Sequence, residues 1–77
     1  MTIKFIKEEL NDQGNIGNEF YNVIENGIEY SVVKCFDYGG SLCEIYVDNQ
    51  PYGLQEDLND IFSEELVDEL WGESDED

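Results

Sequence analysis

The sequence predicts an α+β fold in which a small antiparallel β-meander of three to four strands is followed by a C-terminal acidic helical segment. Residues 19–48 contain short apolar stretches separated by Asn-Gly and Gly-Gly, which are typical turn residues between strands. From Leu54 onward the apolar residues instead recur every three or four positions, which is the period of a helix. With 77 residues, of which 40% are hydrophobic, the chain has room for one small domain, placed at 1–72, and an acidic tail at 73–77.

The N-terminal residues 2–10 fit two kinds of element. Ile3 and Phe5 alternate with Lys4, which favours a strand, although Ile6 falls on the same face as Lys4. As a helix, the same segment would place three apolar residues on one face: Ile3, Ile6 and Leu10. We predict a strand and keep the helix as the alternative. The Asn- and Gly-rich residues 11–18 then form a loop.

Three further strands are predicted at 19–25, 28–37 and 42–48. Asn26 and Gly27 separate the first two, and both residue types accept the positive φ of a tight hairpin turn. Residues 38–41, which include two glycines, form the next turn. Strands joined by such short turns pair with their neighbours in antiparallel order, so we expect a meander.

Both faces of the strands at 28–37 and 42–48 carry apolar residues, whereas a sheet with one solvated face should alternate more cleanly. We therefore expect both faces to be covered. The C-terminal helical segment would cover one face. The N-terminal segment, a second subunit in a homodimer, or a partner protein would cover the other.

The helical segment carries two apolar stripes that point in different directions. The first begins at Leu54 and ends at Phe62, and the second runs from Leu66 to Trp71. One straight helix would place acidic residues in the middle of the first stripe, so we expect a break near Ser63, which is also a good N-cap. The alternative is one straight helix whose second stripe, with Trp71, is left for a partner.

The C-terminal third is strongly acidic. The chain has 20 acidic and three basic residues, a net charge of −17, and more than half of the acids follow Leu54. Negative charge near a helix C-terminus is unfavourable, because the terminal carbonyls already carry partial negative charge. We therefore expect this surface to serve a basic partner. The predicted partner-binding residues are the carboxylates of this region and one aromatic residue: Glu56, Asp57, Asp60, Glu64, Glu65, Asp68, Glu69, Glu73 and Trp71.

Other kinds of chemistry have few candidate residues. The chain has no His or Arg, no phosphate-binding glycine loop and no nucleophile beside a base, so we predict no catalytic residue and no cofactor. Cys35 and Cys43 lack zinc-site spacing, and we interpret them as reduced thiols, with a cross-strand disulfide as the alternative. No loop has the ligand spacing of a calcium site, so no metal site is predicted. The charge excludes direct nucleic-acid binding, and no apolar run could cross a membrane, so we expect a cytoplasmic protein.

The acidic helical segment from Glu56 to Glu73 and the tail to Asp77, on a small α+β frame, resemble a class of inhibitors encoded by bacteriophages and mobile elements. These are the anti-CRISPR and anti-restriction proteins, many of which mimic nucleic acid. The resemblance is one of size, charge and layout over the whole chain. It implies a non-enzymatic protein that occupies the DNA- or RNA-binding surface of a bacterial defence nuclease in the host cytoplasm. The partner would be a basic nucleic-acid-binding protein or nuclease complex.

Two alternative functions remain open from the sequence. An immunity protein or antitoxin that neutralises a basic nuclease toxin would use the same electrostatics. A host-takeover adaptor would instead bind an enzyme through the apolar helix stripe that ends at Trp71, and the acidic residues would then serve mainly for solubility. Salt separates the adaptor from the mimic, because only the mimic should lose affinity steeply as salt rises.

Overall fold

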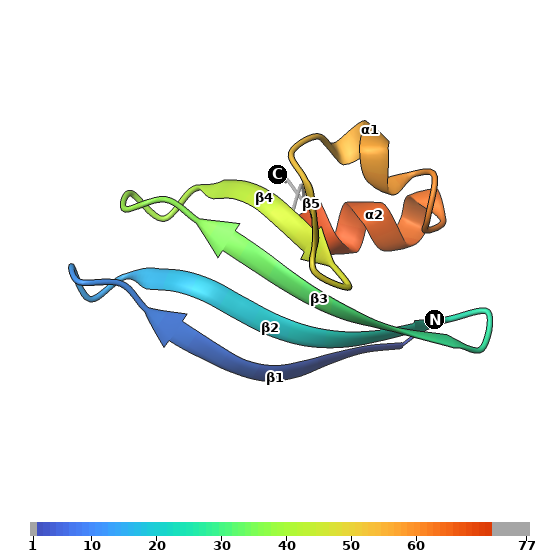
Figure 1. Ribbon diagram of the computed structural model, residues 1–77, viewed down its shortest axis with the longest axis horizontal. Coiled ribbons are helices and arrows are strands. Elements are labelled where there is room, and N and C mark those ends of the chain that lie inside the picture. Colours follow the sequence, from blue (N-terminus) through green and yellow to red (C-terminus); the bar gives the residue numbers. More distant parts are fainter. Residues whose placement is uncertain (1, 72–77) are drawn as a thin grey trace.

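The computed structural model describes residues 2–71, which form one antiparallel sheet of five strands and two short helices (Figure 1). The strands follow one another across the sheet in the order β1-β2-β3-β4-β5, so β1 and β5 are its two edges. The strands are β1 (Thr2–Leu10), β2 (Ile16–Glu25), β3 (Ile28–Phe36), β4 (Leu42–Val47) and β5 (Gln50–Tyr52). The helices are α1 (Gln55–Leu58) and α2 (Glu64–Trp71).

The predicted fold class is wrong. The sheet has five strands instead of three to four, and helix is limited to four residues in α1 and eight in α2. The fold is therefore mostly antiparallel sheet and not a small meander that leads into a long acidic helical segment. Glu73 and the rest of the predicted acidic tail lie outside the described residues.

The N-terminal segment is a strand, which confirms that interpretation of residues 2–10 over the helical alternative. The turn at Asn26-Gly27 is also confirmed, with φ of 55° and 79° at the two residues. Because this loop has two residues, Glu25 pairs with Ile28 and the register of the whole β2–β3 hairpin follows.

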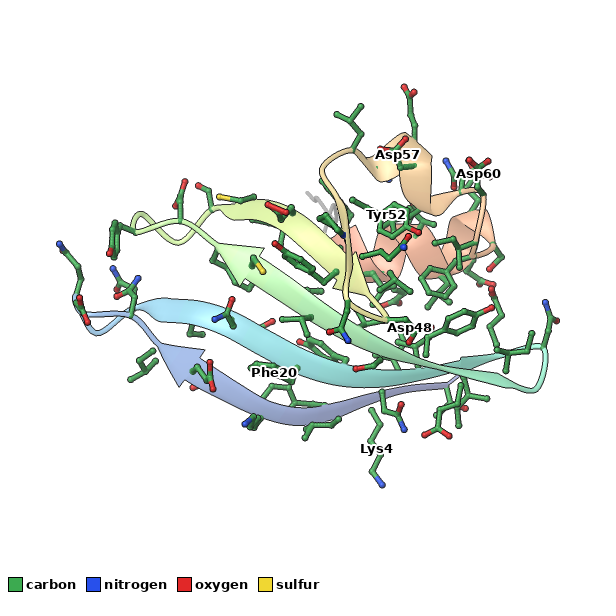
Figure 2. The ribbon with its side chains drawn as sticks, viewed as in Figure 1. Lys4, Phe20, Asp48, Tyr52, Asp57 and Asp60 are labelled. Atoms are coloured by element: carbon green, nitrogen blue, oxygen red, sulfur yellow. The ribbon has the colours of Figure 1, made fainter. Side chains whose placement is uncertain are left out.

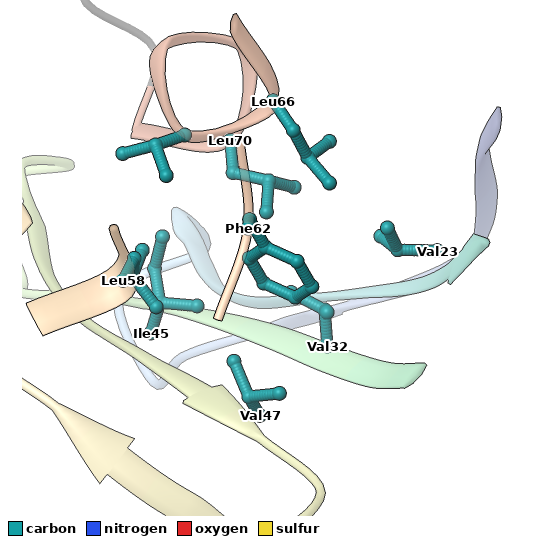
Figure 3. Close-up of a cluster of buried hydrophobic side chains, with 9 residues drawn as sticks. Val23, Val32, Ile45, Val47, Leu58, Phe62, Leu66 and Leu70 are labelled. Atoms are coloured by element: carbon teal, nitrogen blue, oxygen red, sulfur yellow. The ribbon is translucent and has the colours of Figure 1, made fainter. Parts of the chain in front are cut away.

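The core lies between one face of the sheet and the two helices. Its buried members come from β2, β3 and β4 below and from α1, α2 and their connection above (Figure 3). They are Val23, Val32, Ile45, Val47, Leu58, Phe62, Leu66, Val67 and Leu70. Tyr30 extends the core and meets Phe62 edge to face, with the ring centroids 4.8 Å apart. Burial of these apolar side chains is the main stabilising contribution.

The opposite face of the sheet has no covering element within residues 2–71. Phe20 and Val33 pair in register on this face, and Tyr46 follows on β4, so their half-buried side chains shield one another. The N-terminal segment was one of three candidates to cover this face, and it does not do so, because it extends the sheet as β1.

Candidate protein-binding surface

The helices are attached to the sheet through Ser63, the residue before α2. The Ser63 hydroxyl donates a 2.6 Å hydrogen bond to the Glu25 carboxylate of β2, and the Ser63 backbone N–H donates a second one of 3.1 Å. The Leu66 N–H in turn donates to the Ser63 hydroxyl oxygen at 3.4 Å, as in an N-cap. These contacts fix where α2 begins and therefore how its faces are oriented.

The inner face of α2 is buried in the protein's own core. Leu66 is 0% exposed and Val67 and Leu70 are each 1% exposed, while the half-buried Trp71 packs against them. The alternative in which this stripe is left free for a partner is therefore wrong. Trp71, predicted as a partner-binding residue, lies with the core and not at the centre of the acidic surface.

The outer surface of the helices and of their connection is strongly acidic. Seven of the predicted carboxylates fall within the described residues and all are exposed: Glu56, Asp57, Asp60, Glu64, Glu65, Asp68 and Glu69. We call these seven residues the acidic layer. Figure 2 shows Asp57 and Asp60 at the outer side of the helices, away from the sheet. Among residues 2–71 the one ion pair joins Lys7 to Glu9 at 3.8 Å, so no carboxylate of the acidic layer is held in an ion pair there.

The two helices of the acidic layer are joined by a side-chain contact. The Gln55 amide of α1 donates a 3.1 Å hydrogen bond to the Asp68 carboxylate of α2. Leu58 from α1 and Leu66 from α2 are both fully buried in the same core beneath them. Both helices that carry the carboxylates therefore have a fixed position. Their backbone does not need to become ordered when a partner binds.

Lys34 is the one lysine on the helix-covered face of the sheet. It pairs in register with the core residue Ile45, and burial lowers the pKa of its ammonium, although the carboxylates of Glu19 and Glu69 act in the opposite direction. Its Nζ lies 5.2 Å from the centroid of the Tyr21 ring. Lys34 therefore lies beneath the acidic layer, and the outer side of the acidic layer stays negative.

The side chains of Tyr21 and Glu19 on β2 form a hydrogen-bonded pair that the sequence patterns do not predict. The Tyr21 hydroxyl donates a 2.9 Å hydrogen bond to Glu19, and the ring of Phe5 meets the Tyr21 ring edge to face at 5.5 Å. Burial, the Glu19 hydrogen bond and the negative charges of Glu19 and Glu8 raise the pKa of Tyr21 from 10.0 to about 12. This residue is therefore a neutral hydrogen-bond donor at physiological pH.

The cysteines do not face each other. Cys35 pairs in register with Glu44, and both Cys35 and Cys43 are free thiols. Burial raises the pKa of the half-buried Cys35 thiol, which favours its unreactive protonated form. Within residues 2–71, no three His, Cys, Asp or Glu side chains are grouped as they would be to hold a metal ion.

A hollow of about 460 Å³ lies at the end of the sheet where the β1–β2 and β3–β4 loops meet. Its lining is mixed polar and aromatic: Asn11, Gly17, Asn18, Phe36, Asp37 and Tyr38. The Asn15 amide donates a 2.9 Å hydrogen bond to the Tyr38 carbonyl and joins the two loops. Tyr38 is 62% exposed, which makes it the most accessible tyrosine of the molecule. The β3–β4 loop to which it belongs lies at the end of the sheet away from the helices (Figure 1).

Neither described helix has the length and apolar composition needed to cross a bilayer. Comparison with known proteins gave no match to a family model, to a curated protein or to a solved structure.

Proposed function

We propose that this protein is a non-enzymatic inhibitor whose acidic layer mimics nucleic acid and occupies the basic DNA- or RNA-binding surface of a bacterial defence nuclease. The observation that carries the proposal is the exposure of all seven carboxylates on two positioned helices and their connection, with no ion-pair partner among residues 2–71. The resemblance of the chain to small acidic anti-CRISPR and anti-restriction proteins in size and charge supports the same function.

The chemistry of the acidic layer suits the basic surface of a nucleic-acid-binding protein. Duplex DNA presents about one negative charge per 1.7 Å of its axis, and proteins that bind it offer rows of Lys and Arg. Carboxylates accept paired hydrogen bonds from the guanidinium group of Arg, which gives orientation as well as attraction. The long-range field of a net charge of −17 would also speed association with a basic surface. No bond is made or broken, so inhibition would be stoichiometric.

The test uses purified nucleases of the CRISPR and restriction classes, with DNA cleavage as the readout. We expect the wild-type protein to inhibit at least one of them in proportion to its concentration, and to lose affinity steeply as salt rises. The informative variant is Glu64→Gln/Glu65→Gln, which removes two charges from the acidic layer at positions where both side chains are exposed.

A matched variant keeps the change in net charge the same. Glu29→Gln/Glu44→Gln removes two charges from the uncovered face of the sheet, away from the helices. We expect the Glu64/Glu65 variant to weaken inhibition about tenfold or more and the Glu29/Glu44 variant to change it little. Equal losses from both variants would mean that only net charge matters. Inhibition that is insensitive to salt would contradict mimicry.

A further inference from the structure

β1 is a long open edge of the sheet. Eight of its nine residues pair with β2 on one side, and Ile6 is skipped at an irregularity between Phe5 and Lys7. The backbone N–H and C=O groups on the other side of β1 face solvent. Every residue of β1 except Ile3 is exposed. Such an edge is a template for another strand, and folded proteins usually cover it, charge it or shorten it. The opposite edge is already protected, because β5 has three residues and includes Pro51.

β1 also exposes apolar area that the fold itself does not bury. Phe5 is 52% exposed, Ile6 is 58% exposed and Leu10 is 60% exposed. These are three of the seven large apolar side chains that remain exposed in the described part of the chain, and they lie on one strand. A strand added along β1 would cover part of this area as well as the free backbone groups.

The charges of β1 set it apart from the rest of the surface. Two of the three lysines of the chain, Lys4 and Lys7, lie on this strand, and Glu8 and Glu9 follow them, so the strand has no net charge. Figure 2 shows Lys4 pointing away from the helices. An approaching molecule of net charge −17 would meet least repulsion here.

The order of these charges identifies the partner. The lysines come first along the strand and the glutamates come last, so a second β1 in antiparallel orientation places the Lys4 end of each strand beside the Glu8–Glu9 end of the other. We propose that β1 pairs with β1 of a second copy of this chain, about a two-fold axis, to form a continuous ten-stranded sheet. An isologous contact of this kind uses the same residues from both copies.

This dimer is independent of the proposed function. A two-fold axis perpendicular to the sheet keeps both pairs of helices on the same side of it, and in each copy the helices lie over the strands farthest from β1 (Figure 1). Both acidic layers would stay exposed. Inhibition of a nuclease and formation of the dimer can therefore each fail without the other.

The test measures association by sedimentation equilibrium from about 10 μM to about 1 mM protein. We expect a monomer–dimer equilibrium in the wild-type protein that shifts toward dimer from low to moderate salt, because screening relieves the repulsion between the acidic copies. Lys4→Glu should weaken the dimer about tenfold, since two attractive pairs become repulsive. Glu9→Lys should also weaken it, although it lowers the net negative charge, because like charges then meet at Lys4.

The charge-swapped variant Lys4→Glu/Glu9→Lys should restore the wild-type dimer, because it inverts both members of each pair. A control, Gln50→Glu/Asn59→Glu, adds the same negative charge as Lys4→Glu at exposed positions away from β1 and should leave the dimer in place. Hydrogen exchange gives a second readout: amides of residues 2–10 should exchange more slowly at high protein concentration. A monomer at every concentration, or a dimer that is indifferent to Lys4→Glu with no slowing in β1, would overturn the proposal.

Discussion

Tyr21 shows how a single residue responds to the acidic character of the chain. Its hydroxyl donates to Glu19 and lies in the field of Glu8, so ionisation would place a third negative charge beside two others. The pKa of about 12 is raised from 10.0, so between these values the folded state keeps a proton that the unfolded state has lost. The contribution of Tyr21 to stability is therefore complete below pH 10 and is lost as the pH rises through 12.

We expect an NMR titration of the tyrosine rings to show the Tyr21 signal changing near pH 12, well after an ordinary tyrosine. Tyr21→Phe assigns the signal. Glu19→Gln should move the transition toward lower pH, because it removes one of the two nearby negative charges but keeps a hydrogen-bond acceptor in place. A Tyr21 transition near pH 10 in the folded wild-type protein would show that the Glu19 contact is absent in solution.

The sequence is sufficient to predict part of the arrangement around Tyr21. The two-residue turn at Asn26-Gly27 makes Glu25 pair with Ile28, and counting outward from that pair places Glu19 opposite Lys34 and Tyr21 opposite Val32. The rotamer that brings the Tyr21 hydroxyl to Glu19 depends on packing against Phe5, which the sequence pattern does not specify.

At the scale of one element, α2 depends on its buried face and not on its charges. It has two acidic residues in its first turn, Glu64 and Glu65, which suit a helix N-terminus, but no basic residue in its last turn. We therefore expect Leu66→Ala, at a position 0% exposed, to cost about 2–5 kcal/mol of the free energy of unfolding. A loss of this size is a large fraction of the stability of a domain this small.

Leu54→Ala is the matched control for Leu66→Ala, because the same side-chain atoms are removed from a residue that is 61% exposed. It should change the free energy of unfolding by no more than about 0.5 kcal/mol. Urea unfolding followed by circular dichroism measures both variants. Similar costs at the two positions would mean that α2 does not pack on the sheet as described.

The elements that sequence patterns missed have local causes. β5 is absent from the predicted strands because it contains Pro51, which cannot donate to a strand pair, but at an edge that donor is not needed. The first helix was expected to reach Phe62, yet α1 ends at Leu58, and the following turn lets Phe62 enter the core beside Tyr30. Periodicity alone could not distinguish four helical residues followed by a turn from nine helical residues.

The folded molecule is destabilised by repulsion among its own negative charges. Its net charge is −17, and the one ion pair among residues 2–71 is exposed and therefore weak. Because dissolved salt screens the repulsion between carboxylates, we expect stability to rise with salt. Relief of about 1 kcal/mol of repulsion would raise Tm by roughly 4–8 °C in a domain of this size.

Thermal unfolding from low to moderate sodium chloride measures this effect. The Glu64→Gln/Glu65→Gln variant should start from a higher Tm in low salt and gain less from added salt, because two of the repelling charges are gone. These measurements belong at a protein concentration where the chain is monomeric, so that association does not contribute. A Tm that falls as salt is added would contradict the expectation.

For the whole molecule, the sequence patterns predict the hairpins and the break between the apolar stripes, but they do not predict the proportions of strand and helix. An α+β class was inferred because the helical period extends over the whole C-terminal third, whereas only twelve described residues are helical and the rest of the segment connects them. The carboxylates of the acidic layer were predicted as exposed, and this follows from their positions between apolar stripes. The place of Trp71 depends on how the helices dock, which periodicity does not specify.

The unequal edges of the sheet have a consequence for the protein at high concentration, as in a cell that produces it in excess. Growth of a fibril by edge-to-edge addition needs two usable edges on each copy, one to receive a strand and one to offer it. This sheet has one long edge, at β1, and ends on its other side in the three residues around Pro51. Addition along β1 would therefore stop at two copies and leave no template for a third.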